Sequence, residues 1–428
     1  MKQEMKNSKI ALLGLQHMFA MFGATILVPL LSGLSVQTTL ISVGIGTLIF
    51  HLLAKGKVPA FLGSSFAFLV GIQLITDAET GLFAGSGLDI SEKLAYATGG
   101  ILVSGMVYVV FAIIVKIIGV KKFMELVPPI VTAPTVILIG IMLAPFAISQ
   151  SSNNLILALT TLVIVTIASS YGKGIVKLTP ILLGIAGAYI LALILHFIGM
   201  TNPDGSAILD FTAAADAAIV GMPPIMLPRF NLAAILIMVP FAIATIAEHV
   251  GDMVALSTIT GEDFIEEPGL TRTLLGDGVA SMFSGLIGGP ASTTYGENVG
   301  VVALTKISNA RVVMMAAIYA TVLGFSPIFG AIIYSVPAAI IGGASFMLYG
   351  MIAAVGIRNL VDAKIDVSKT KNLTVIAIML VTGLGLRFGP RITFMLWNTE
   401  IPIDRLGIAI AVVVGVLLNI ILPEDNKG

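Results

Sequence analysis

The sequence lacks cysteine and contains little charge. Without cysteine, the chain can form no disulfide, no thiolate metal site and no cysteine nucleophile. Aspartate, glutamate, lysine and arginine make up only 11% of the 428 residues, whereas they make up about 25% of a typical soluble domain. The formal net charge is zero, which removes the electrostatic basis for binding nucleic acid. Disulfide-rich, thiol-dependent and nucleic-acid-binding classes are therefore excluded.

Hydrophobic residues dominate the composition instead. They make up 57% of the chain, and the mean hydropathy is +1.05. A helix needs about 20 apolar residues to cross a bilayer, and apolar runs of this kind recur from one end of the sequence to the other. The 45 glycines and 19 prolines suit helices that pack closely and are interrupted in places. The composition predicts a multi-pass protein of the cell membrane.

Fourteen apolar segments can be counted along the chain. The clear ones are 10–31, 36–54, 95–118, 127–147, 154–171, 178–200, 231–257, 310–333, 335–357, 371–387 and 402–422, and the weaker ones are 58–76, 273–289 and 291–306. A polar loop at 201–230 divides them into two sets of seven, within residues 1–200 and 231–428. With an odd number in each half, the second half enters the membrane from the opposite side, as in inverted-repeat transporters.

Positive charge predicts the orientation of the chain. With the N-terminus inside, all but five of the 23 lysines and arginines fall in cytoplasmic segments, including Lys2 and Lys427 in the two tails. The five on the outer side are Lys93, Arg229, Arg387, Arg391 and Arg405. The start of the chain has no small-residue cleavage site, so we expect a retained tail. The positive-inside rule then predicts that both termini are cytoplasmic.

Two segments in matching positions of the halves are interrupted by small polar residues. They read VPAFLGSSFAFLVG at 58–71 and PASTTYGENVG at 290–300. Non-helical backbone at membrane depth is tolerated only where protein or a water-filled cavity covers it. Paired broken segments are therefore the best indication of a substrate site in a transporter sequence. Glycine-rich helices that are kinked for packing are the alternative.

Few acids fall within the predicted spans. Glu248 and Asp252 are four residues apart, so they project from one helix face, and Glu297 lies in the second interrupted segment. A charge at the bilayer centre costs about 2.5–3.5 kcal/mol, which a hydrated cavity or the uptake of a proton would reduce. Both suit proton-coupled transport, and satisfied structural hydrogen bonds are the alternative. For Asp277, near the start of its predicted span, we prefer the structural interpretation.

Histidines and aromatic residues offer further candidates. Gln16 and His17, on the first predicted span, either orient an acid on a neighbouring helix or serve packing alone. His249 points about 100° away from Glu248 around the helix, so we expect a structural role for it. Phe66 lies inside the first interrupted segment, where its ring could stack on a flat ligand.

Four motifs, in order and at consistent spacing, resemble those of a known family. They are LQHMFAMFGATILVP at 15–29, VPAFLGSSFAF at 58–68, IAEHVGD at 246–252 and TTYGENVGVVALT at 293–305. The family signature is an acid, glutamine or proline followed by Asn-x-Gly and a threonine, which here are Glu297, Asn298, Gly300 and Thr305. The sequence resembles the nucleobase–ascorbate transporter family of nucleobase/cation symporters, and specifically its bacterial uracil permease branch.

The resemblance implies a fold. We expect an all-α polytopic membrane protein with fourteen transmembrane segments in two inverted seven-helix repeats. The third and tenth segments would be broken and would carry short extended strands. Spans 1–4 and 8–11 would form a core domain, spans 5–7 and 12–14 a gate domain, and residues 201–230 an extracellular connection. Family members are commonly homodimers, so a homodimer within the lipid bilayer is implied as well.

The resemblance also implies roles for individual residues. The implied substrate-binding residues are Glu248, Glu297, Phe66, Tyr295, Gly296 and Tyr349. The implied proton-coupling residues are Glu248, Asp252 and Glu297, and the supporting residues are Gln16, His17, Asn298 and Thr305. Glu248 and Glu297 correspond to the two carboxylates that contact the base, and Tyr349 matches a position on the gate side.

One position departs from the uracil permeases. They carry histidine four residues after the first glutamate, where this chain has Asp252, as in relatives that take xanthine or urate. Those relatives usually begin the signature with glutamine, whereas this chain has Glu297, as pyrimidine carriers do. We therefore expect proton-coupled uptake of uracil. A xanthine- or urate-type purine symporter and a sodium-coupled nucleobase carrier are the alternatives.

Other classes of function fit the sequence less well. A channel would need a continuous file of polar residues, whereas the acids cluster. An anion transporter of the same fold would lack carboxylates in its anion site. No metal-ligand cluster, serine–histidine dyad or phosphate-binding loop stands out in the sequence. We therefore expect neither an enzyme nor a bound metal or other cofactor.

Overall fold

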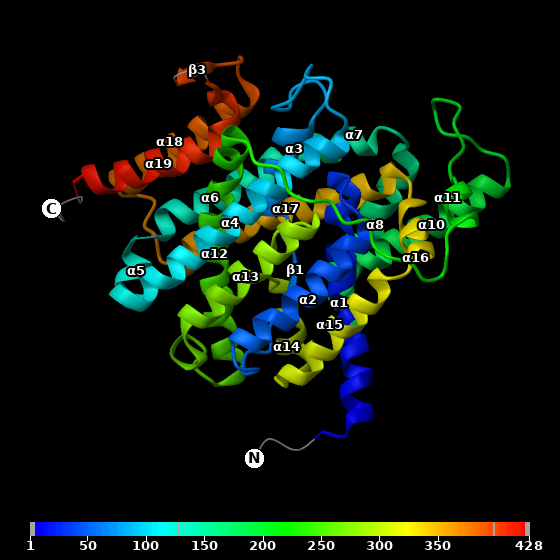
Figure 1. Ribbon diagram of the computed structural model, residues 1–428, viewed down its shortest axis with the longest axis horizontal. Coiled ribbons are helices and arrows are strands. Elements are labelled where there is room, and N and C mark those ends of the chain that lie inside the picture. The colour runs from blue at the N-terminus through cyan, green and yellow to red at the C-terminus, as the bar shows by residue number, and fades with distance from the viewer. Residues whose placement is uncertain (1–4, 127, 397–398, 424–428) are drawn as a thin grey trace.

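The computed structural model of the chain describes residues 5–126, 128–396 and 399–423. Lys2 and Lys427, in the predicted cytoplasmic tails, lie outside the described residues. Figure 1 shows a bundle of helices that cross at varied angles, with the short strand β1 near its centre and a hairpin at one edge. Helices dominate because long apolar runs can satisfy their backbone hydrogen bonds inside a membrane only within the helix itself.

Helices and strands follow a similar order in the two halves. The first half contains α1 (Asn7–Ser32), α2 (Val36–Leu53), β1 (Leu62–Ser64), α3 (Ala67–Thr76), α4 (Ile90–Ile118), α5 (Val120–Leu126), α6 (Pro129–Met142), α7 (Ala144–Ser151), α8 (Leu155–Tyr171), α9 (Ile175–Leu178) and α10 (Pro180–Phe197). The connection carries α11 (Thr212–Ala215). The second half contains α12 (Leu232–Thr260), η1 (Ile265–Gly269), α13 (Leu270–Ile287), β2 (Ser292–Thr294), α14 (Gly296–Thr305), α15 (Ala310–Gly324), α16 (Pro327–Tyr334), α17 (Ala338–Asp362), α18 (Thr370–Phe388), β3 (Thr393–Leu396), β4 (Thr399–Pro402), η2 (Ile403–Leu406) and α19 (Gly407–Ile421).

Many of these helices can cross a membrane. Within the described residues, nine helices are long and apolar enough, or up to ten if α15 and α16 count as one span. The predicted count of fourteen is therefore not confirmed by length and hydropathy. The other four predicted segments correspond to α3, α8, α13 and α14, of which α3 and α14 have only 10 residues each.

The structure differs from the sequence-based expectation in two places. The predicted span 310–333 is two helices, because the chain bends by 86° between α15 and α16. Ser326 has extended backbone dihedral angles (φ −110°, ψ 97°), as expected for a residue that precedes proline. The antiparallel hairpin β3–β4 was not expected either, and it brings Thr393 opposite Pro402.

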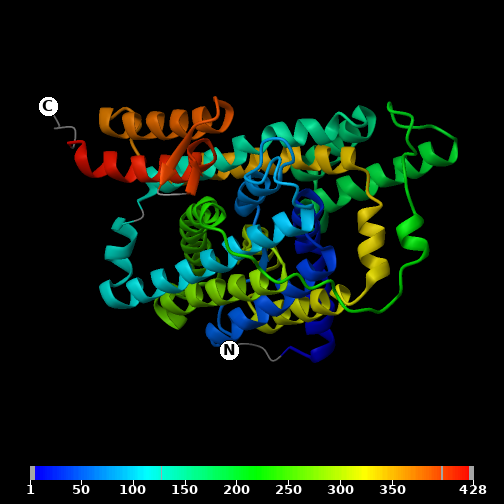
Figure 2. The ribbon, with the colours of Figure 1, turned by 45° about the horizontal axis from the view of Figure 1, so that its top comes forward.

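Close helix packing surrounds the centre of the molecule. Helix α13 packs against α4 and α2, and Figure 2 shows α4 and α13 side by side. Small residues permit this approach: a Cβ on Gly278 would lie 2.9 Å from the carbonyl oxygen of Gly105 on α4. Small residues at such contacts are typical of membrane helices, whose association depends on packing.

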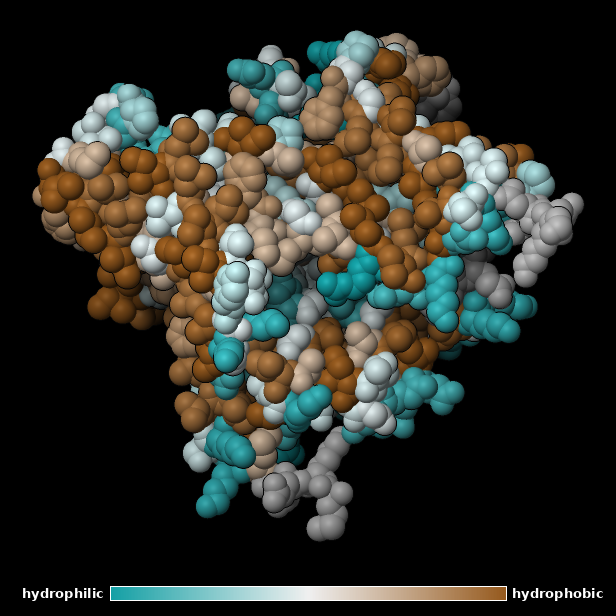
Figure 3. Space-filling view, turned by 180° about the vertical axis from the view of Figure 1, so that it is seen from behind, coloured by the Kyte–Doolittle hydropathy of each residue, from teal (hydrophilic) through white to brown (hydrophobic). Residues whose placement is uncertain are grey.

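The outer surface is largely apolar. Large hydrophobic side chains such as Leu159, Ile190 and Ile194 are more than half exposed. Figure 3 shows hydrophobic residues over large areas of one face, with hydrophilic residues along its upper edge and across its lower part. Such a surface suits contact with lipid, because apolar patches of this size are rare on soluble monomers.

The two interrupted segments meet as a two-stranded ribbon at the centre of the fold. β1 pairs with β2 in antiparallel register, with Leu62 opposite Thr294 and Ser64 opposite Ser292. The Tyr295 N–H donates to the Phe61 carbonyl (3.1 Å), and the Ser65 N–H donates to that of Ala291 (2.9 Å). Since hydrogen-bonded and non-hydrogen-bonded pairs alternate along an antiparallel ladder, the backbone groups of Leu62, Ser64, Ser292 and Thr294 face away from the ribbon.

Side chains of neighbouring elements satisfy these outward-facing backbone groups. On α2, the Thr47 hydroxyl donates to the Leu62 carbonyl (3.2 Å) and accepts from the Leu62 N–H (3.0 Å). On α13, the Ser281 hydroxyl does the same for Ser292, at 2.7 and 3.1 Å. Each half of the chain thus uses one hydroxyl to hold the first residue of its own strand, both backbone groups at once.

A testable prediction concerns Thr47. Changing Thr47→Val keeps the shape but leaves the N–H and the carbonyl of Leu62 without this partner, so the free energy of unfolding should fall by about 1–3 kcal/mol. Chemical unfolding in detergent micelles measures this change.

Thr161→Val is the matched control. Thr161 is also fully buried, but its hydroxyl only donates to the Leu157 carbonyl within α8. The loss of this hydroxyl leaves no backbone group of a strand unpaired, so the free energy of unfolding should change by no more than about 0.5 kcal/mol. Equal effects at both positions would contradict the role assigned to Thr47.

Candidate functional site

Each strand of the ribbon leads directly into a short helix. Phe66 is the N-cap residue of α3, and Tyr295 is that of α14. The first N–H groups of a helix have no partner within it and carry partial positive charge. Within the described residues, neither of these ends has a side-chain cap. Both helix starts therefore offer backbone donors to a ligand.

Three of the predicted acids gather at the start of α14. Glu297 lies in the first turn of α14, and Glu248 and Asp252 lie one turn apart on α12. A Cβ built on Gly296 would have Asp252 Oδ1 as its nearest neighbour, at 3.9 Å, which places that carboxylate beside the first residue of α14. The carboxyl groups of Glu248 and Asp252 lie within electrostatic range of that of Glu297. The structure thus brings together the acids that the sequence singled out.

These acids are not sealed within the protein. Glu248 and Gly296 are exposed, and Asp252 and Glu297 are partly exposed, although α12 itself lies mostly within the fold. Asp252 Oδ2 is buried and has no hydrogen-bond partner among the described residues. Accessible carboxylates on an internal membrane helix indicate space that water or a ligand can enter.

A cavity of about 200 Å³ reaches one of these acids. Glu297 and Gly300 of α14 line it, opposite α1 and the start of α10. Lys177, on α9, lies in the same lining. From the sequence, Lys177 is expected only in a cytoplasmic connection, since nothing in its local pattern links it to Glu297, 120 positions further on. Glu248 and Asp252 do not contribute to this lining.

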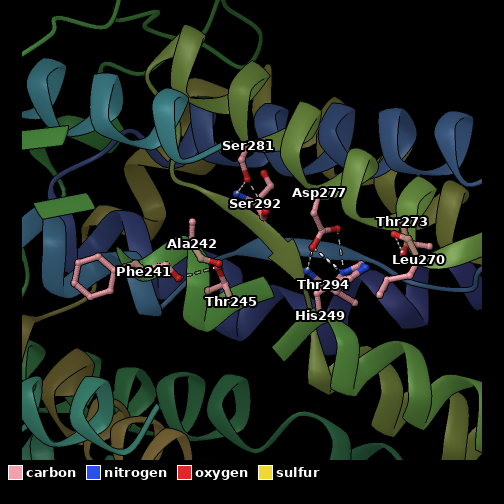
Figure 4. A network of polar contacts seen from close by, with 10 residues as sticks. All are labelled: Phe241, Ala242, Thr245, His249, Leu270, Thr273, Asp277, Ser281, Ser292 and Thr294. Atoms are coloured by element: carbon pink, nitrogen blue, oxygen red, sulfur yellow. Dashed lines mark hydrogen bonds and ion pairs between the residues drawn. The ribbon is translucent and has the colours of Figure 1, made fainter. Parts of the chain in front are cut away.

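A buried polar network contacts strand β2 of the ribbon (Figure 4). His249 Nδ1 lies 2.9 Å from Asp277 Oδ2 and 2.8 Å from the Thr294 hydroxyl, and the Thr294 N–H donates to Asp277 Oδ2 (3.3 Å). The side chains of His249 and Asp277 are completely buried. The structural interpretation of both residues therefore agrees with the geometry: they join α12 and α13 to β2.

Spacing explains how one helix holds two strand residues. Asp277 and Ser281 are four residues apart on α13, a rise of about 6 Å. Thr294 and Ser292 are two residues apart on β2, a rise of about 6.6 Å. The two rises match, so Asp277 contacts Thr294 while Ser281 contacts Ser292 (Figure 4).

Two predicted site residues point their side chains into the protein interior. The Tyr295 hydroxyl donates to the Ser64 carbonyl (2.9 Å), and its ring packs over Gly63. The Asn298 side chain is fully buried and donates to the Pro59 carbonyl (2.7 Å). Both side chains therefore join the second interrupted segment to the first, and the cavity lining contains neither of them.

The remaining predicted residues lie around this centre. Phe66 is partly buried at the start of α3, whereas Tyr349 of α17 is buried in the main core. His17 is buried beside Asn298, but neither ring nitrogen has a well-formed hydrogen bond among the described residues. Gln16 is partly exposed. Thr305 donates to the Val301 carbonyl (2.8 Å) at the end of α14.

Across the described ranges, no group of three or more histidine, aspartate or glutamate side chains could hold a metal ion. The arrangement instead offers carboxylate acceptors, helix-end donors and an accessible space, which can bind a polar organic molecule by hydrogen bonds.

Comparison with known proteins gives consistent matches. A family model described as "Permease family" (Xan_ur_permease) matches residues 8–392. The probable uracil permease of Pasteurella multocida is 37% identical over 99% of this chain and 96% of its own length. The uracil permease of Bacillus subtilis is 38% identical over 96% and 92%, and the putative pyrimidine permease RutG of Escherichia coli is 40% identical over 88% and 83%.

Solved structures share the fold at low sequence identity. The transmembrane domain of the cyanobacterial bicarbonate transporter BicA superposes with a TM-score of 0.65 at 14% identity, covering 97% of this chain and 98% of that domain. The structure of SLC26A9 gives a TM-score of 0.66 at 13% identity, covering 96% of this chain and 65% of that one. At such identities the likeness concerns the fold alone.

The buried network generates a testable prediction. Asp277→Leu removes the acceptor for the Thr294 N–H and leaves His249 Nδ1 with the Thr294 hydroxyl as its remaining neighbour. The free energy of unfolding should therefore fall by about 1–3 kcal/mol. Asp277→Asn, whose amide oxygen still accepts a hydrogen bond, should cost less. Chemical unfolding in detergent micelles measures both variants.

A double-mutant cycle tests whether the pair acts as a unit. In the Asp277→Leu background, His249→Leu should cost less than in the wild-type chain, with a coupling free energy of about 0.5–3 kcal/mol. Additive effects would mean that His249 and Asp277 stabilise the ribbon independently.

Proposed function

Because the chain belongs to the nucleobase–ascorbate transporter family, we propose that it carries uracil into the cell by proton-coupled alternating access. The observation that carries this proposal is the group of three accessible acids at the start of α14. The multi-pass fold and the permease family make the chain a membrane transporter. Uracil as cargo is supported by relatives that are named uracil permeases, at 37% and 38% identity over nearly the whole chain.

The chemistry of uracil fits the groups at this site. Uracil is flat and neutral, with two N–H donors and two carbonyl acceptors. In the proposal, Glu248 and Glu297 accept from the N–H groups of uracil, and backbone N–H groups in the first turns of α3 and α14 donate to its carbonyls. Phe66 would cover one face of the ring. Tyr295 would take part through its backbone, because its side chain is buried. Tyr349, whose side chain is also buried, would take part from the gate side.

Alternating access requires two groups of helices that move relative to each other. The seven proposed segments of residues 1–200 are α1, α2, β1–α3, α4, α6–α7, α8 and α10. Those of residues 231–428 are α12, α13, β2–α14, α15, α17, α18 and α19. In this proposal residues 201–230 lie outside the cell and both termini lie inside. The first four segments of each half form the core and the last three the gate. Helices α5 and α16 then link core to gate at equivalent places, and the matching Thr47 and Ser281 contacts support an inverted repeat. A homodimer completes the proposed architecture.

Proton coupling follows from the same acids. If the loaded carrier reorients only when a proton neutralises one acid among Glu248, Asp252 and Glu297, the inward proton gradient drives uptake. A potential of 100 mV supplies about 2.3 kcal/mol per charge and one pH unit about 1.4 kcal/mol. One proton per base would then support roughly 400–500-fold accumulation. Gln16 and His17 lie on α1, and His17, beside Asn298, would support the position of Glu297.

Two alternatives rest on the same residues. Asp252 stands where uracil carriers have histidine, which favours a purine such as xanthine or urate. Carboxylates also suit sodium as the coupling ion. Competition of labelled uracil uptake by unlabelled uracil and xanthine, with and without sodium, distinguishes these cases.

Glu297→Gln tests the substrate role. The amide replaces one carboxylate acceptor with a donor, so uracil uptake and binding should fall by about 10–100-fold. Labelled uracil binding to purified protein and uptake by cells lacking their own carriers measure this loss. Glu79→Gln, the same change in an exposed loop, is the control and should transport normally. Unchanged binding by Glu297→Gln would exclude the site.

Asp252→Asn tests the coupling role. A side chain that cannot take up a proton should abolish accumulation while exchange of labelled for unlabelled uracil continues. Accumulation and exchange in proteoliposomes, with and without an uncoupler, separate the two activities. Wild-type accumulation that persists after the proton gradient is collapsed would contradict proton coupling.

A further inference from the structure

A second cavity of about 200 Å³ lies away from the acids. Helices α4, α5, α6, α12 and α19 enclose it, and its lining shares no residue with the cavity at Glu297. Its main wall residues are Phe111, Ile114, Phe123, Val131, Val412 and Val416. We call this space the α4–α19 groove.

The groove lies between two apolar helix surfaces. On α4, Ile113 and Ile117 are at least half exposed beside the wall residue Ile114, and on α19 Val413 and Leu417 are at least half exposed beside Val416. Its polar side chains are threonines, of which Thr135 already donates to the Val131 carbonyl. Water is disfavoured in such a space, and a cavity of about 150 Å³ with similar walls holds benzene. In a membrane, the apolar group available to fill this space is a lipid acyl chain.

Three exposed lysines lie close in sequence to residues that line the groove. Lys116, on the last turn of α4, and Lys121 and Lys122, on α5, are all exposed. Residues 116–122 contain no acid, and the next acid along α5 is Glu125. Phe123, next to Lys122, lines the groove and meets Phe111 edge to face at 5.7 Å, which holds α5 against α4. Each of the three lysines thus lies one or two positions from a residue that lines the groove.

We propose that the α4–α19 groove binds one anionic glycerophospholipid, with an acyl chain along the apolar walls and its phosphate against Lys116, Lys121 and Lys122. The acyl chain alone would give no selectivity between lipids, because the bilayer interior is as apolar as the groove walls. Charge supplies the selectivity, at about fivefold in affinity for each lysine near an anionic headgroup. Three lysines would favour an anionic headgroup by about 100-fold over a zwitterionic one.

The position of the groove gives the lipid a consequence for transport. Helices α4 and α12 belong to the proposed core, and α6 and α19 to the proposed gate, so one lipid would contact both groups. This consequence rests on the proposed function, whereas lipid binding itself does not. A binding measurement therefore succeeds or fails independently of uracil transport.

The test compares two headgroups on the purified full-length chain. Phosphatidylglycerol and phosphatidylethanolamine with identical acyl chains are titrated in detergent, and bound lipid is counted by native mass spectrometry. Phosphatidylglycerol should bind about 100-fold more tightly, and the combined variant Lys116→Gln/Lys121→Gln/Lys122→Gln should remove that preference. Equal binding of the two lipids by the wild-type chain would overturn the proposal.

A second lysine cluster provides the charge control. The connection between α17 and α18 carries Lys364, Lys369 and, at the start of α18, Lys371. Their combined change to glutamine alters the net charge equally but should leave the preference intact. If both triple variants lose the preference equally, general surface charge rather than the α4–α19 groove attracts the lipid.

A pair of variants on α19 tests the apolar walls. Val416→Phe fills the groove and should lower the affinity for phosphatidylglycerol at least tenfold, whereas Val413→Phe, on the exposed face of the same helix, should not. Ile114→Phe provides a second filling variant if Val416→Phe does not yield folded protein. Unchanged affinity in a folded filling variant would exclude the groove as the site of the acyl chain.

Discussion

The structure depends on satisfying backbone hydrogen bonds where two membrane segments are not helical. Lipid offers no partner for an N–H or a carbonyl, so an unwound segment needs partners within the protein. The ribbon of β1 and β2 meets half of this need by mutual pairing. Thr47, Ser281, Asp277 and Tyr295 meet much of the rest, because each contacts a backbone group that faces away from the ribbon.

This arrangement separates holding the backbone from binding a ligand. The buried residues Asp277, His249 and Asn298 are engaged in fixing the two interrupted segments. Glu248, Asp252 and Glu297 remain accessible beside the start of α14. The ribbon thus leads into the start of α14 next to three acids, and the proposed transport uses this geometry. Helix α12 also connects the two proposed sites, since Ala244 lines the α4–α19 groove one turn before Glu248.

Much of the site could be predicted from the sequence, and some of its geometry could not. The interrupted segments, the i, i+4 spacing of Glu248 and Asp252, and the signature around Glu297 are local patterns, and the structure places these acids together. The inward direction of Tyr295 could not be predicted, because it depends on Gly63 and Ser64 more than 230 positions away. The place of Lys177 in the cavity lining could not be predicted either, because Lys177 lies 120 positions from Glu297 in the sequence.

The membrane class, the family and the two places where helices break follow from the sequence without the structure. Hydropathy, small polar residues and motifs are local patterns that can be recognised in neighbouring positions of the chain. Tertiary structure alone decided which hydroxyl meets which strand residue, which acids stay accessible, and that the predicted span 310–333 bends into α15 and α16. These outcomes depend on contacts between segments distant in the chain. Such contacts form only when helices pack and every backbone group at membrane depth has to find a partner.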